Sequence, residues 1–106
     1  MFYASRFMTA LSELESSIIH HQKADEDAMF DTIKRSKAQG MKPLEAAASY
    51  FVTEAERGLA AAPDKWIPMV RQAAKKIRVW SSQEQGCRAL ADRLFNLLRD
   101  AEPDEA

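Results

Sequence analysis

The sequence predicts an all-α protein, a compact bundle of four to five amphipathic helices joined by short loops. Five segments repeat apolar residues at spacings of three and four, which places those residues on one face of a helix. Residues that start and stop helices fall in nearly every gap between these segments. Apolar residues make up 46% of the 106 residues, which is enough for one small core.

The first helix is expected over residues 2–22. Its main apolar stripe consists of Tyr3, Phe7, Leu11, Leu14 and Ile18. Met8 and Ile19 lie together on a second side, so this helix is apolar around more of its circumference than a surface helix needs. We therefore expect Met8 and Ile19 to take part in self-association, with a homodimer as its simplest form.

A second helix is expected over residues 25–37, with acidic residues in its first turn and basic residues in its last. Both ends suit the helix dipole, and Gly40 marks the stop. Its apolar residues are few: Met29, Phe30 and Ile33. Such a helix depends on its neighbours and should be among the less stable elements. The sequence leaves open whether it continues from the first helix with a bend near Lys23.

Prolines punctuate the third and fourth helices. Pro43 fits the first turn of a third helix, whose apolar face extends over residues 44–59. Gly58 falls on that face, where it either lets another helix approach closely or frays the helix end before Pro63. A fourth helix is expected from Pro68 to Trp80, after a loop that includes Trp66 and Ile67. Its inner stripe consists of Val70, Ala73, Ala74 and Ile77, and Trp80 closes the end of the core.

Ser81 and Glu84 have the spacing of a capping box at the start of a fifth helix. The apolar face of this helix consists of Cys87, Leu90, Ala91, Leu94, Leu97, Leu98 and Ala101. Pro103 ends it. We therefore expect residues 1–99 to form a single helical domain and residues 100–106 to form an acidic, flexible C-terminal tail.

Composition excludes several classes of protein. Cys87 is the single cysteine, so no internal disulfide can form, which fits a reducing compartment. The N-terminal segment lacks the unbroken apolar centre of a signal peptide, and no apolar run approaches the roughly 18 residues of a membrane span. We expect a soluble cytoplasmic protein with no membrane partner.

Signatures of catalysis, metals and cofactors are absent from the sequence. The densest group of metal-ligand types is His20, His21, Asp25 and Asp27. The two histidines are adjacent and diverge by about 100° on a helix, so we expect no metal there. Cys87 lies on an apolar face with no histidine nearby in sequence, and we expect a buried, inert thiol. Without a Gly-rich phosphate loop or a Cys-x-x-Cys motif, neither a cofactor nor an enzyme is predicted.

The segment from Trp66 to Trp80 carries the clearest candidate for a binding surface. Arg71, Lys75 and Arg78 follow at intervals of four and three, so their charges align on the outer side of the fourth helix. Val79 points to the polar side beside them. Aromatic, Met and Arg residues are enriched at protein interfaces. The predicted partner-binding residues are Trp66, Ile67, Met69, Arg71, Lys75, Arg78 and Val79.

These observations favour a small helical protein–protein interaction module, namely an adaptor, regulator or inhibitor of a partner protein. The alternative is a nucleic-acid-binding regulator, because aligned cations on the fourth helix can bind phosphates along a backbone. Against it, the net charge of −1 opposes indiscriminate nucleic-acid binding. The segment also lacks the tight Gly-containing turn between two short helices of a helix-turn-helix motif.

Overall fold

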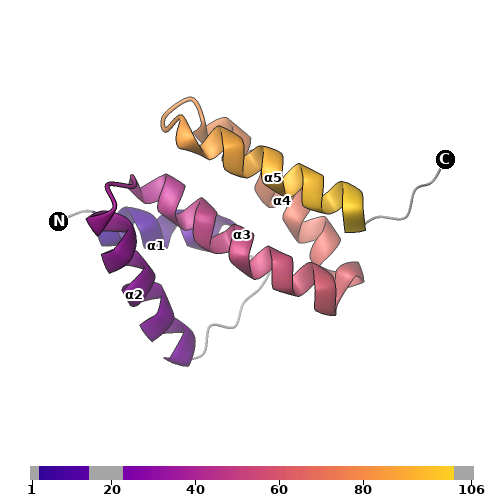
Figure 1. Ribbon diagram of the computed structural model, residues 1–106, viewed down its shortest axis with the longest axis horizontal. Helices are drawn as coiled ribbons and strands as arrows, with labels where there is room; N and C mark the ends of the chain where they lie inside the picture. The colour runs from indigo at the N-terminus through magenta and orange to yellow at the C-terminus, as the bar shows by residue number, and fades with distance from the viewer. Residues whose placement is uncertain (1–2, 15–22, 102–106) are drawn as a thin grey trace.

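A computed structural model describes residues 3–14 and 23–101 of the chain. In this part it contains five helices: α1 (Tyr3–Leu14), α2 (Lys23–Ala38), α3 (Pro43–Ala61), α4 (Pro63–Trp80) and α5 (Gly86–Ala101). The predicted all-α bundle is therefore confirmed. In Figure 1, α3 crosses the middle of the molecule with α1 behind it, α4 and α5 pair along one side, and α2 splays away on the other. Because α5 ends at Ala101, the predicted tail boundary at residue 100 falls inside this helix.

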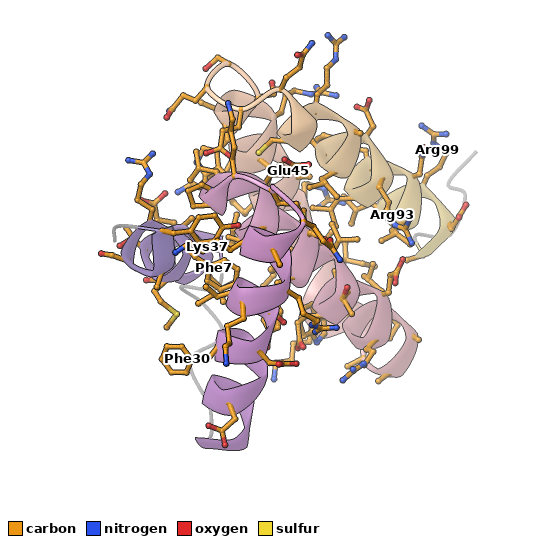
Figure 2. The ribbon with its side chains drawn as sticks, turned by 60° about the vertical axis from the view of Figure 1, so that its left-hand side comes forward. Phe7, Phe30, Lys37, Glu45, Arg93 and Arg99 are labelled. Carbon is orange, nitrogen blue, oxygen red and sulfur yellow. The ribbon has the colours of Figure 1, made fainter. Side chains whose placement is uncertain are left out.

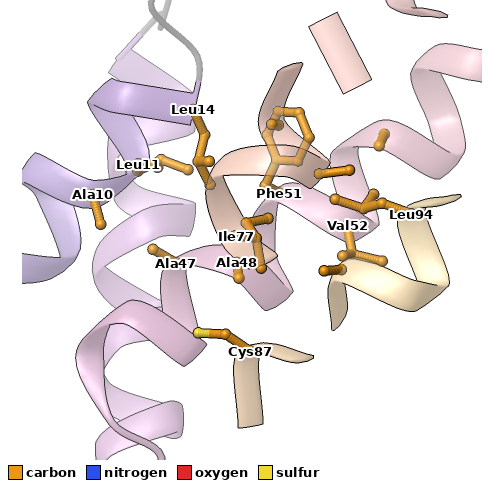
Figure 3. Close-up of a cluster of buried hydrophobic side chains, with 14 of the residues drawn as sticks. Ala10, Leu11, Leu14, Ala47, Ala48, Phe51, Val52, Ile77, Cys87 and Leu94 are labelled. Atoms are coloured by element: carbon orange, nitrogen blue, oxygen red, sulfur yellow. The ribbon is translucent and has the colours of Figure 1, made fainter. Parts of the chain in front are cut away.

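The core is shared by α1, α3, α4 and α5. Its largest fully buried side chains are Phe7, Phe51, Val70, Ile77, Cys87 and Leu94. Figure 3 shows the α1 side chains Leu11 and Leu14 on one side of the cluster and Leu94 of α5 on the other, with Phe51 between them. The apolar stripes predicted for these helices are thus the faces they bury, and Trp80 is buried as expected.

Helix α4 begins five residues earlier than predicted, at Pro63 rather than at Pro68. Pro63 occupies the first turn, where its missing N–H costs nothing, and Pro68 lies inside the helix. This start continues the buried face N-terminally, since Trp66 precedes Val70 by one turn. Packing of Trp66 against the core stabilises the first two turns of the helix, which include Pro68.

Gly58 of α3 is the contact point for Trp66. It is buried, and a Cβ atom placed there would overlap the Trp66 indole ring. The same indole lies 6.3 Å from the Phe51 ring, measured between centroids. Of the two interpretations that the sequence left open for Gly58, close helix approach is therefore correct.

Glu84 caps a helix far from it in sequence. Helix α5 begins at Gly86, and the buried Glu84 carboxylate instead accepts hydrogen bonds from the backbone N–H groups of Leu44 (3.3 Å) and Glu45 (2.9 Å). These are free donors in the first turn of α3, where Lys42 provides no side-chain cap. In return, the Glu45 carboxylate packs against Gly86, where a Cβ atom would overlap it. The predicted capping box for α5 is therefore wrong. Instead, the N-terminal end of α3 and the segment that begins α5 contact each other through Glu84 and Glu45.

Helix α2 is the least anchored element. Among its described side chains, only Ile33 and Ser36 are buried, and Phe30 is 53% exposed. Figure 2 shows Phe30 projecting outward from α2. Gly40 ends the helix as predicted: its φ is 81°, and the next residue, Met41, donates its N–H to the Ser36 carbonyl oxygen at 3.0 Å.

The predicted link between the first two helices, together with Ile18, Ile19, His20 and His21, lies outside the described residues. Across residues 3–14 and 23–101, no helix combines the length and the apolar character that crossing a membrane requires.

Candidate interaction surface

The structure separates the seven predicted partner-binding residues onto different sides of α4. Trp66 is half-buried against the core, while Ile67 and Met69 are also half-buried. Met69 lines a hollow beside α1. On the outer side, Arg71, Lys75, Arg78 and Val79 are exposed, and Val79 is 68% exposed. An interface built around Trp66 as the anchor is therefore less favourable than the sequence suggested, whereas the aligned cations remain accessible.

Arg78 connects the cations of α4 to α5. Its guanidinium carbon lies 4.6 Å from the centroid of the Phe95 ring, a distance at which a cation is attracted by the ring face. One of its terminal nitrogens is 3.8 Å from a carboxylate oxygen of Asp92. Both partners are on α5, so the basic side of α4 faces the side of α5 that carries Asp92 and Phe95.

Helix α5 extends this surface with its own stripe. Arg88, Asp92, Phe95 and Arg99 recur at intervals of four, three and four, which places them on one side of the helix. Arg88 and Arg99 are exposed at its two ends. The two stripes thus lie side by side and form one surface, which we call the basic face: Arg71, Lys75, Arg78, Arg88 and Arg99, with Asp92 and Phe95 among them.

Arg88, Phe95 and Arg99 are not among the site residues predicted from the sequence. They are spaced at seven and four residues, which also places them on one side of a helix, so a signal was present. What the sequence could not supply is the pairing of these two helix sides, which the Arg78 contacts reveal.

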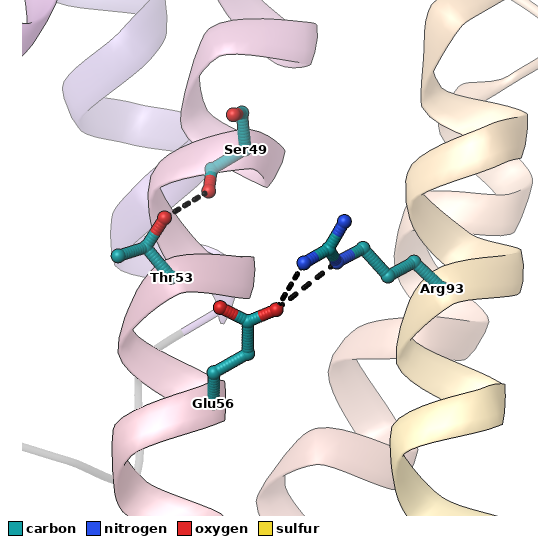
Figure 4. A network of polar contacts seen from close by, with 4 residues as sticks. All are labelled: Ser49, Thr53, Glu56 and Arg93. Atoms are coloured by element: carbon teal, nitrogen blue, oxygen red, sulfur yellow. Dashed lines mark hydrogen bonds and ion pairs between the residues drawn. The ribbon is translucent and has the colours of Figure 1, made fainter.

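Arg93 has a different role from these arginines. It donates from Nε to Glu56 Oε2 of α3 at 3.1 Å, and its terminal nitrogen contacts the same oxygen (Figure 4). In Figure 2, Arg93 and Arg99 leave α5 near its C-terminal end in different directions. Arg93 therefore joins α5 to α3, whereas Arg99 extends the basic face.

Two titratable groups of the described residues, Cys87 and Tyr3, have raised pKa values. Burial, followed by the negative charges of Glu84 and Glu45, raises the pKa of the Cys87 thiol to about 12. The thiol is therefore protonated at neutral pH, which suppresses its nucleophilicity. Burial also raises the pKa of Tyr3, whose hydroxyl donates to the Met41 carbonyl oxygen at 2.7 Å.

Metal ligands are not gathered anywhere in the described part of the chain, which holds no group of three or more His, Cys, Asp or Glu residues able to bind an ion. Of the four residues considered for a metal, Asp27 is exposed on α2. Helix α2 also contains the backbone of Asp25.

The function of the basic face is inferred from the residues that form it. Comparison of the chain with protein-family models, with curated proteins and with solved structures gives no match.

Proposed function

We propose that this protein is a non-catalytic interaction module, an adaptor, regulator or inhibitor, that docks on an acidic segment of a partner protein through the basic face. One observation carries the proposal: exposed cations line adjacent sides of α4 and α5, which Arg78 connects through its contacts with Asp92 and Phe95, in a chain whose net charge is −1. Charge segregated in this way attracts an anionic surface and orients the encounter with it.

The composition of the face favours a protein over a nucleic acid. Asp92 beside Arg78 repels a phosphate and a carboxylate alike, so the apolar residues of this region distinguish the two kinds of partner. The half-buried Phe95 ring and the exposed Val79 add apolar contacts that a protein side chain can fill. The ion pair between Arg78 and Asp92 is solvent-exposed and contributes at most about 1 kcal/mol, so Arg78 can exchange Asp92 for a carboxylate of the partner.

Charge reversal with a matched control tests this proposal. The variant Lys75→Glu/Arg99→Glu changes two exposed cations of the basic face, and Lys34→Glu/Lys42→Glu changes two exposed cations elsewhere by the same charge. Tagged proteins would be used to capture partners from the native host, with quantitative mass spectrometry. We expect the wild type and the control to retain a protein that the face variant loses at least roughly tenfold. Equal capture by all three proteins would contradict the proposal.

Nucleic-acid binding by the same face is the second candidate, because the cations on α4 are spaced at four and three residues along one side. Gel shifts at low salt with duplex DNA and with single-stranded RNA separate the two. Our proposal expects no complex at micromolar protein. A complex that weakens steeply with salt and is lost in Lys75→Glu/Arg99→Glu would establish the nucleic-acid alternative instead.

A further inference from the structure

A groove between α1 and α4 hollows the side of the molecule away from the basic face. It consists of two hollows of about 310 and 340 Å³ that meet at Glu13. The half-buried Met69 lines the first hollow, and the buried Trp80 borders the second. We call this region the α1–α4 groove and define it by six residues: Arg6, Thr9, Glu13, Met69, Lys76 and Trp80.

The charges along the α1 rim of the groove are complementary to those of a second, antiparallel copy of the same rim. Arg6 and Glu13 are both exposed and are separated by seven residues, so they lie on the same flank of α1, two turns and roughly 10 Å apart. Between them, the exposed residue on this flank is the short Thr9. Along the helix, the rim therefore carries a positive charge at Arg6, a small side chain at Thr9 and a negative charge at Glu13. When a second copy runs in the opposite direction, its negative charge lies opposite the positive charge of the first copy.

We propose that the α1–α4 groove is the contact between two copies of this chain, related by a two-fold axis near Thr9. In a two-fold contact the same patch occurs on both sides, so each Arg6 faces Glu13 of the second copy, and the pair forms twice. Thr9 at the crossing lets the two α1 helices approach closely. The half-buried Met69 supplies apolar area that the second copy covers.

This contact differs from the self-association predicted through Met8 and Ile19. Met8 is half-buried against the core, and its position in the helix places it on the flank of α1 opposite Arg6. Ile19 lies outside the described residues. Because the groove and the basic face occupy different flanks of α4, the dimer would present two basic faces and strengthen binding to a partner with two acidic segments.

A charge swap tests the proposed pairing. Sedimentation equilibrium from about 1 µM to several hundred µM would measure the mass of the wild type and of Arg6→Glu, Glu13→Arg and the double swap. We expect the wild type to approach twice 12.0 kDa at high concentration. Each single variant loses both ion pairs and creates two like-charge contacts, which weakens the dimer roughly tenfold or more. The double swap restores the pairs and returns the dissociation constant to within about threefold of wild type.

Two controls keep this result separate from the proposed function. Thermal melting followed by circular dichroism would show that the single variants remain folded, and Lys75→Glu/Arg99→Glu should dimerise like the wild type. A 12.0 kDa monomer at every concentration would overturn the proposed contact and leave the groove to a different partner. A dimer indifferent to Arg6→Glu, or one that the double swap does not rescue, would overturn it as well.

Discussion

Helices α2 and α5 have the same length, 16 residues, but they are attached to the molecule in different ways. Helix α5 buries four residues along its length: Cys87, Ala91, Leu94 and Leu98. Among the described side chains of α2, the buried ones are Ile33 and Ser36, and both lie in its C-terminal half. Helix α5 is therefore anchored along its whole length, whereas the described buried side chains of α2 are confined to its C-terminal half.

This difference separates two kinds of sequence signal, the residues that start and stop a helix and the apolar residues that attach it to the core. The charges at the ends of α2 and its stop at Gly40 determine where the helix lies in the sequence. They contribute little to holding it against the bundle, since helix stability in proteins comes mainly from burying an apolar face. The basic face is formed on the well-anchored pair α4 and α5, where packing fixes the relative positions of its cations.

A matched pair of phenylalanine substitutions gives the largest test of this comparison. Phe51→Ala removes a fully buried ring from the core and should lower the free energy of unfolding by about 3–5 kcal/mol. Phe30→Ala removes a ring that is 53% exposed on α2 and should change it by less than about 0.5 kcal/mol. Urea unfolding followed by circular dichroism measures both values. Similar losses for the two variants would mean that α2 is anchored as firmly as the core.

The contact between Gly58 and Trp66 tests how tightly α3 and α4 are packed. A Cβ atom at Gly58 overlaps the indole, and such overpacking costs about 1–3 kcal/mol, which exceeds the roughly 1 kcal/mol that alanine gains in a helix. We therefore expect Gly58→Ala to lower the free energy of unfolding by up to about 2 kcal/mol. In the background Trp66→Ala the ring is absent, and there Gly58→Ala should be neutral or stabilising. A loss of the same size in both backgrounds would rule out the overlap as its cause.

Removing the cap of α3 should have a slightly smaller effect. Glu84→Ala leaves the N–H groups of Leu44 and Glu45 without their acceptor, and we expect a loss of about 0.5–2 kcal/mol in the free energy of unfolding. Glu84→Gln keeps one acceptor oxygen and should lose less. Hydrogen exchange should quicken at Leu44 and Glu45 in the alanine variant and remain unchanged in α2. An unchanged exchange rate at both amides would show that Glu84 does not cap α3.

Much of the fold could be predicted from the sequence, because the stripes on α1, α3 and α5 depend only on helical spacing. The predictions that were wrong concern helix ends, where a contact with a residue far away in the sequence determines the structure. Pro63 and Pro68 both fit a helix start, and only the contact between Trp66 and Gly58 shows which one begins α4. Glu84 had a suitable spacing from Ser81, but its hydrogen bonds are to residues 40 and 39 positions earlier.

The candidate site was predictable to a smaller extent. The alignment of Arg71, Lys75 and Arg78 follows from their spacing, and the structure leaves all three exposed. Their neighbours on α5 could not be identified, because spacing within one helix does not say which side another helix covers. The same limit applies to Trp66, whose burial depends on a glycine in α3.

The pH dependence of the free energy of unfolding gives the test with the smallest expected effect. It depends on one buried residue of α5, Cys87. The pKa of the Cys87 thiol is about 12 in the folded protein, above its ordinary value of 9.0. As pH rises, the unfolded chain therefore loses this proton first. The free energy of unfolding should be unaffected by Cys87 below about pH 8.5 and should fall between about pH 9 and 12.

At about pH 9.5 the loss due to Cys87 should be under about 1 kcal/mol. Tyr3, whose pKa is also raised, adds to the fall only near and above its ordinary value of 10.0. Measurements from about pH 7 to 9.5 thus separate the two groups, and Cys87→Ala is the control. That variant is less stable throughout because it loses a buried sulfur, but its stability should decline less between pH 8.5 and 9.5. Parallel pH profiles for Cys87→Ala and the wild type would show that the thiol ionises as readily in the fold as in the unfolded chain.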